Sequence, residues 1–152
     1  MLLDDLDRAR AQKLLELDPF NLMFDFNTLA ASAVGTIVAV TTNNDSDFVM
    51  RYSNYSAYSA VGVPVVDPDY LVAFTDGSAA RGLQDNPIHL RTCLGTAERP
   101  FVWPTPKLFK GGSTIQIALT NLTALAARVT IALMGFKVFY FKGYTRDDLG
   151  HY

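Results

Sequence analysis

The sequence of 152 residues has one cysteine, Cys93, and two histidines, His89 and His151. A single cysteine excludes a disulfide within the chain and any metal cluster built on several cysteine ligands. Apolar residues make up 49% of the chain, yet no uninterrupted apolar run approaches the roughly 20 residues that a membrane-spanning helix needs. We therefore expect a fold stabilised by core packing and no membrane partner.

The chain also lacks a large excess of charge of either sign. Thirteen Lys and Arg stand against 15 Asp and Glu, which gives a formal net charge of −2. Because no basic block is present to contact phosphates, nucleic acid is not an expected partner. The first ten residues carry acids where a secretory signal carries positive charge, so we expect assembly in a cytoplasm.

Groups for catalysis are few. His151 is the penultimate residue, and His89 lies in a predicted strand with no acidic residue at metal-ligand spacing; a hydrogen-bonded strand histidine is the better interpretation. Cys93 would point the same way as His89 along a strand but about 13 Å from it, which suits a buried small hydrophobe. No Gly-rich phosphate loop is present. We expect no enzyme activity, no cofactor and no metal site.

Two polar patterns have structural interpretations. Residues 43–47 offer oxygen ligands but lack the central glycine and distant glutamate of an EF-hand, so turn and capping roles are expected, with calcium as the minor alternative. Asn-x-Ser/Thr triplets begin at Asn44, Asn54 and Asn121. Without a secretory signal we interpret them as chance matches to the glycosylation pattern.

Alternation of apolar and polar residues with a period of two dominates the chain after residue 19. It predicts strands at 20–27, 35–42, 47–53, 61–66, 69–76, 113–121 and 127–141, with a further short strand within 86–95. We expect the inward parity of the last strand to shift at Gly135 through a bulge. Seven or eight short strands without βαβ alternation predict an all-β fold, an antiparallel β-sandwich of jelly-roll type.

The first residues predict an amphipathic helix that ends before Pro19, which disfavours helical geometry at the preceding residue. One side of this helix would carry four leucines, with Arg10 in the same stripe: Leu3, Leu6, Leu14 and Leu17. It either covers an open end of its own domain or docks as an arm on a neighbouring subunit. The predicted organisation is thus a helical arm (1–18), a sandwich (19–142) and a polar tail (143–152).

Two segments suit contact with a partner. Residues 51–60 place Tyr52, Tyr55 and Tyr58 at three-residue intervals, a composition found on adaptable binding loops; a surface loop between strands is the alternative. Pro100, Pro104 and Pro106 remove backbone donors, so their segment must run along a sheet edge or across a face. We expect Phe101 and Phe109 to plug the core, whereas Trp103 suits a core or an interface equally.

The order of these signals resembles the jelly-roll head-decoration or cement proteins of tailed bacteriophages and prophages. The resemblance rests on DFVMRYS, FTDGSAARGL, a Leu-Gly turn, P-x-L-F, GGSTIQIALTN and VTIALMGFKVF, within residues 20–141. Its landmarks are structural rather than catalytic: Asp47-Phe48, Thr120-Asn121, Gly135 and Lys137. The N-terminal helix and the Tyr-Ser stretch depart from the family pattern.

The resemblance implies a non-enzymatic virion protein that binds the phage major capsid protein on the capsid exterior, after assembly in the host cytoplasm. It implies a homo-oligomer, a dimer or trimer at a symmetry axis. Two alternatives remain: a structural protein of the neck or tail, and a carbohydrate- or receptor-binding sandwich that uses Trp103 or the tyrosines as sugar platforms.

Overall fold

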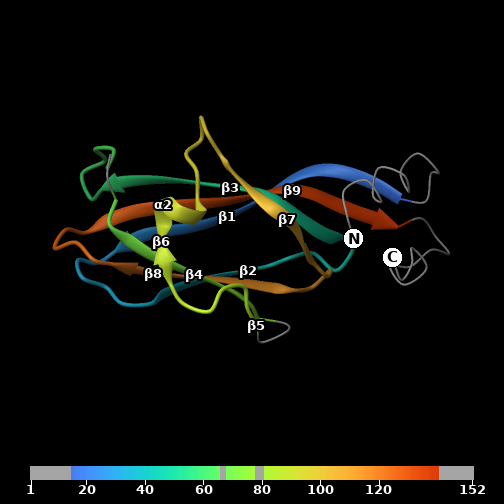
Figure 1. The fold of residues 1–152 in the computed structure, drawn as a ribbon, viewed down its shortest axis with the longest axis horizontal. Helices are drawn as coiled ribbons and strands as arrows, with labels where there is room; N and C mark the ends of the chain where they lie inside the picture. The colour runs from blue at the N-terminus through green and yellow to red at the C-terminus, as the bar shows by residue number, and fades with distance from the viewer. Residues whose placement is uncertain (1–14, 66–67, 78–80, 141–152) are drawn as a thin grey trace.

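The computed structural model describes residues 15–65, 68–77 and 81–140, which form two facing antiparallel sheets (Figure 1). The first sheet has the order β1-β9-β3-β7. Its strands are β1 (Leu15–Leu29), β9 (Ala127–Tyr140), β3 (Asp47–Ser59) and β7 (Phe101–Phe109). The second sheet has the order β2-β8-β4-β5, and β6 also pairs with β4. Its strands are β2 (Thr36–Thr41), β8 (Thr114–Asn121), β4 (Tyr70–Asp76), β5 (Arg81–Gly82) and β6 (Ile88–His89).

The path of the chain between the two sheets is that of a jelly roll. β1, β2, β3 and β4 alternate between the sheets, and so do β7, β8 and β9. The last strand, β9, pairs with both β1 and β3 and so holds the first sheet together. The predicted antiparallel sandwich of jelly-roll type is therefore confirmed.

The core lies between the sheets and follows the period of two. On β1, Leu22, Phe24 and Phe26 are at most 5% exposed. On β8, Ile115, Ile117 and Leu119 are fully buried. Both strands confirm the faces that the alternation predicted, because successive side chains of a strand point to opposite sides of the sheet.

One β-bulge lies in a different strand from the one predicted. β9 pairs with β1 in continuous register through Gly135, so β9 carries no extra residue there. Instead Met50 pairs with Gly135 and Tyr52 with Met134, which leaves Arg51 as the extra residue, in β3. The neighbourhood of the bulge was predicted correctly, but the bulged strand was not.

The apolar residues after Gly135 have another explanation, a second apolar cluster on the outer face of the first sheet. Its members all come from that sheet: Leu15, Leu17, Val49 and Val138, with Leu108, Phe136 and Tyr140 packed against them. Leu17 pairs with Val138, and Val49 pairs with Phe136, on the face opposite the main core. The first sheet thus has apolar residues on both faces at this end. For this reason the sequence of β9 suggests a shift in which residues face inward, although the strand is regular.

The start of β1 shows that the predicted end of the N-terminal helix is wrong. Residues 15–18, assigned to the helix, form the start of β1, where Leu15 pairs with Tyr140 and Leu17 with Val138. Pro19 lies within the strand and did not end a helix. Pairing with β9 and burial of Leu15 and Leu17 decide the conformation here. Residues 1–14, like residues 141–152, lie outside the described part.

Two short segments also differ from the prediction. Residues 61–65 form no strand; apart from one isolated bridge between Tyr58 and Pro64, they belong to the connection between β3 and β4. The predicted short strand within 86–95 exists as β6, but it continues into a four-residue helix, α2 (Leu90–Cys93). Within the described residues, no helix is long and apolar enough to cross a membrane.

Candidate interaction surfaces

The three tyrosines of the Tyr-Ser stretch lie in a strand rather than in a surface loop. β3 continues through Ser59, so the loop interpretation is wrong. Three-residue spacing in a strand places neighbours on opposite faces. Tyr55, opposite Ile131, packs against the main core, whereas Tyr52 and Tyr58 lie on the outer face opposite Met134 and Arg128. The stretch therefore does not present its tyrosines on one surface, although Tyr58 is 41% exposed.

The proline segment forms β7, the edge strand of the first sheet, as the missing backbone donors predicted. Its register with β3 is interrupted: Val102 pairs with Tyr52 and Lys107 with Met50, so residues 103–106 face the bulge unpaired. Pro104 is exposed and Pro106 is half-buried. β7 therefore closes the sheet without offering a regular edge for a further strand.

Trp103 turns inward from this edge. Its ring meets Phe74 of the opposite sheet edge-to-face at 5.9 Å between centroids, and Phe101 at 5.6 Å. Its Nε1 donates to Ser53 Oγ at 3.0 Å. Of the two roles considered, the core role fits these contacts. Phe109 is 1% exposed, as expected for a core plug, whereas Phe101 is half-buried.

The predicted interface residues are thus not gathered at one place. Leu3, Leu6, Arg10 and Leu14 lie outside the described residues, and Leu17 is a member of β1. Tyr52 and Tyr58 lie on the outer face of β3, and Trp103, Pro104 and Pro106 lie on β7. Their role in binding a partner stays a prediction.

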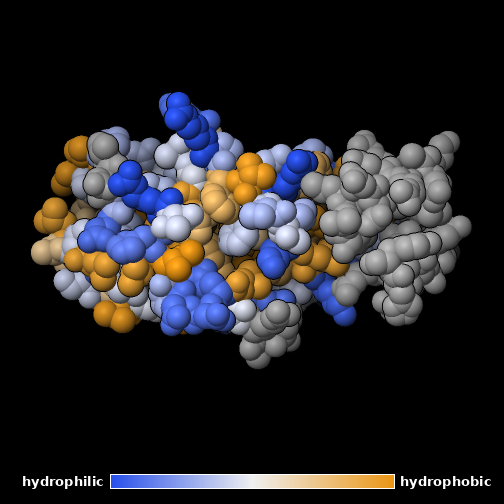
Figure 2. All heavy atoms as spheres, viewed as in Figure 1, coloured by the Kyte–Doolittle hydropathy of each residue, from blue (hydrophilic) through white to orange (hydrophobic). Residues whose placement is uncertain are grey.

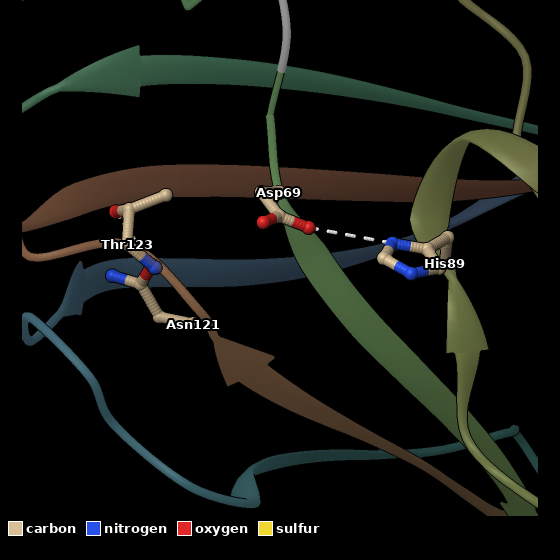
Figure 3. Close-up of polar contacts among 4 residues, drawn as sticks. All are labelled: Asp69, His89, Asn121 and Thr123. Atoms are coloured by element: carbon tan, nitrogen blue, oxygen red, sulfur yellow. Dashed lines mark hydrogen bonds and ion pairs between the residues drawn. The ribbon is translucent and has the colours of Figure 1, made fainter.

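A histidine–carboxylate pair lies on the second sheet, where the sequence analysis found no acidic neighbour for His89. The pairing of β6 with β4 brings His89 next to Asp69, and Nδ1 lies 3.4 Å from Oδ1 (Figure 3). Their side chains are 62% and 56% exposed, in a surface hollow with Pro68 and Arg91. An open, solvated pair of this kind is an ordinary surface interaction.

The acidic turn, the minor candidate for calcium, is tied into the fold through Asp47. No group of three or more His, Cys, Asp or Glu comes together in the described part of the chain. In the acidic turn, Asp47 accepts hydrogen bonds from the Gly111 amide at 2.8 Å and the Tyr140 hydroxyl at 3.0 Å. The predicted turn and capping role of this segment is confirmed at Asp47.

Cys93 is 4% exposed and belongs to the main core, as predicted, although it lies in α2 and not in a strand. Burial raises the pKa of its thiol to about 11. Since the thiolate is the reactive form, Cys93 is a packing residue and not a nucleophile at neutral pH.

Asn121 has a structural role that the glycosylation pattern concealed. It is 1% exposed at the end of β8, and its Nδ2 donates to the carbonyls of Ala30 at 2.9 Å and Leu125 at 2.8 Å. Its Oδ1 accepts from the amide and hydroxyl of Thr123. The buried Asn121 thus ties the start of the β8–β9 connection to the β1–β2 connection, and Thr123 lies beside it (Figure 3).

No protein-family model matches the chain, and no curated protein matches it. Among solved structures, the chain is similar to one from the extra small virus of the giant freshwater prawn Macrobrachium rosenbergii, a virus-like particle. The two share 16% identity over 80% of this chain and 79% of the other, with a TM-score of 0.29. So low a score supports no conclusion about the role of this chain.

Proposed function

We propose that this chain is a non-enzymatic structural protein of a tailed-phage virion, which binds the outside of the capsid as a decoration or cement subunit. The resemblance in strand order and motifs suggests this role. A two-sheet jelly roll is compatible with it, since viral capsid proteins use such sheets, but so do lectins and cupins. The fold alone is therefore only an analogy.

One observation carries the proposal: in the described residues, polar side chains serve the fold, whereas several large apolar side chains are exposed. Asp47, Ser53 and Asn121 are occupied within the fold by hydrogen bonds, and the exposed His89 and Asp69 form an ordinary surface pair. Large apolar side chains, in contrast, are left exposed at the surface, among them Ile37 of β2 at 60% and Met23 of β1 at 55%. Surfaces of this composition serve contact with other proteins rather than catalysis.

The mechanism would be cooperative clamping. A subunit bound across the joint between two coat proteins stabilises their assembled state by mass action, because it binds that state and not the separated subunits. Many copies on one closed shell make individually weak contacts effectively irreversible. No reaction is required of the subunit, only a rigid body and a complementary surface.

The carbohydrate-binding alternative has less support from the geometry. A sugar platform needs an aromatic ring with an open face, and Trp103 is half-buried with its nitrogen bonded to Ser53. Tyr52 lies beneath Arg51, whose guanidinium carbon is 5.1 Å from the ring centroid. Neither ring is presented as a free platform.

Co-sedimentation tests the proposal. Shells of the virus whose genome encodes this chain, prepared without it, are mixed with the purified chain and pelleted. We expect saturable binding at a fixed number of copies per shell. A folded chain that stays in the supernatant contradicts the head role, and binding to isolated tails instead would move the protein to the neck or tail.

A further inference from the structure

Three loops meet at the end of the sandwich opposite the start of β1 and the end of β9 (Figure 1). They are the β1–β2 connection (30–35), part of the β3–β4 connection (60–65) and the β8–β9 connection (122–126), and we call them together the tip. Register places them together, because Ala127 pairs with both Leu29 and Ser59.

The tip exposes apolar side chains in all three loops. Figure 2 shows hydrophobic residues gathered at this end, on the left of the view. They are Val34 at 84%, Val61 at 86%, Val63 at 60%, Leu122 at 47% and Leu125 at 74% exposed. None of the three segments contains a charged residue. Exposed apolar side chains gathered without charge mark a surface that another molecule covers.

Two of the loops repeat one sequence. Ser-Ala-Val-Gly occurs at 32–35 and again at 59–62. Each copy ends in a glycine with positive φ, 61° at Gly35 and 85° at Gly62, and each presents its valine to solvent to the same extent. The repeated sequence thus exposes a valine in both loops, although the backbone differs, since Ser32 has a φ of 51° whereas Ser59 belongs to β3.

Hydrogen bonds hold these loops in place. The Ser32 amide donates to the Thr123 carbonyl at 2.9 Å, and the Asn121 amide donates to the Ala33 carbonyl at 2.7 Å. The loop after β3 is closed on itself, since the Ser59 amide donates to the Val63 carbonyl at 2.8 Å. Apolar groups fixed in this way lose little conformational entropy when a partner covers them.

We propose that the tip is a self-association surface that docks on the tip of a second copy of this chain. A partner must offer an uncharged apolar surface, and a second copy offers one in its own tip. Two copies that carry a net charge of −2 can approach tip to tip because no like charges meet there. In a two-fold dimer, Val34 of each copy can face Val61 of the other, since such an interface pairs residue i with j and j with i.

This inference goes beyond the proposed function and holds whether or not the chain binds a capsid. Sedimentation velocity of the full chain over a dilution series tests it. We expect a concentration-dependent dimer. In the double variant Val34→Asp/Val61→Asp, dimerisation should weaken at least about tenfold, because two carboxylates per copy would have to be buried without partners.

The matched control is Met23→Asp/Val102→Asp, which adds the same two charges at side chains that are 55% and 53% exposed on β1 and β7, away from the tip. It should dimerise as the unaltered chain does. Leu125→Asp, in the third loop, provides a second test if the double valine variant does not fold by circular dichroism. A chain that stays monomeric at all concentrations, or a dimer that both double variants weaken equally, overturns the inference.

Discussion

Gly135 shows at the scale of a single residue how closely the strands of the first sheet approach one another. A Cβ atom at this position would lie 1.8 Å from the Val49 carbonyl oxygen and 2.8 Å from its carbon. Both are backbone atoms beside the bulge at Arg51, and they cannot turn away as a flexible side chain could. Here glycine is required by space.

Gly135→Ala should therefore lower the free energy of unfolding by about 1–3 kcal/mol, the usual cost of forcing extra atoms into a packed site. Urea denaturation followed by Trp103 fluorescence measures it. Gly77→Ala is the comparison, because its Cβ would lie 3.0 Å from the nearest atom, the Thr114 carbonyl oxygen. Equal losses in the two variants would contradict the close approach at Gly135.

Asn121 carries a second prediction at this scale. Asn121→Asp keeps the acceptor for Thr123 but removes the donor that satisfies the carbonyls of Ala30 and Leu125. Leaving buried carbonyls unpaired costs about 1–3 kcal/mol, and unfolding in urea should shift accordingly. Thr123→Ser, which keeps both of its bonds to Asn121, should stay close to the unaltered chain. If Asn121→Asp is as stable as that control, the turn is not what joins these loops.

The thiol of Cys93 makes stability depend on pH in the alkaline range. Burial raises its pKa from 9.0 to about 11, so the unfolded chain loses this proton at lower pH than the folded chain does. The contribution to stability is complete below pH 9 and is lost as the pH rises toward 11, by about 2 kcal/mol. Subtracting the pH profile of Cys93→Ala from that of the unaltered chain isolates this loss. Parallel profiles between pH 9 and 11 would contradict it.

At the scale of elements, Ser53 joins three parts of the fold. On β3 its Oγ donates to the carbonyl of Cys93 in α2 at 3.1 Å and accepts from Trp103 of β7 at 3.0 Å. Ser53 is fully buried. One hydroxyl therefore bonds to groups on two other elements, α2 and β7.

Ser53→Ala should destabilise the fold by about 1–3 kcal/mol, since the Trp103 nitrogen and the Cys93 carbonyl would both lose this partner. A double-mutant cycle with Trp103→Phe isolates the shared bond, because phenylalanine keeps an aromatic ring there but has no N–H. Ser56→Ala, at an exposed position of the same strand, is the control and should change stability by less than about 0.5 kcal/mol. Additive losses for Ser53 and Trp103 would show that the two residues are not coupled.

The elements also show what the sequence could predict. β8 and the middle of β1 were predictable because one face of each is buried, and their apolar residues repeat with a period of two. The proline edge followed from donors that a central strand would need. Both properties depend only on residues that are close together in the chain, so the sequence alone predicts them.

Properties that depend on pairing could not be predicted in the same way. Asp69 meets His89 only because β6 pairs with β4, and the Tyr-Ser stretch is a strand because β9 lies beside it. Residues 15–18 carry a helical pattern, but their pairing with β9 and the outer apolar cluster decide otherwise. The bulge was predicted in β9 and not at Arg51 of β3, because β9 carries apolar residues on both of its faces near Gly135.

At the scale of the whole molecule, the fold separates two kinds of surface. The interior between the sheets is closed, and no buried side-chain nitrogen or oxygen in the described part lacks a hydrogen-bond partner. Apolar side chains also remain exposed outside the tip, among them Met23 and Ile37. A rigid, internally satisfied body with such a surface is suited to bracing other subunits, which is the central claim of the proposed function.

Electron cryomicroscopy of capsids tests that claim most directly. Shells of the virus that encodes this chain are imaged with the chain absent and after its addition. The account predicts added density on the outer surface, at repeated positions that bridge coat subunits, into which the two-sheet body fits. Identical shells in the two samples, or added density inside the shell only, would contradict it.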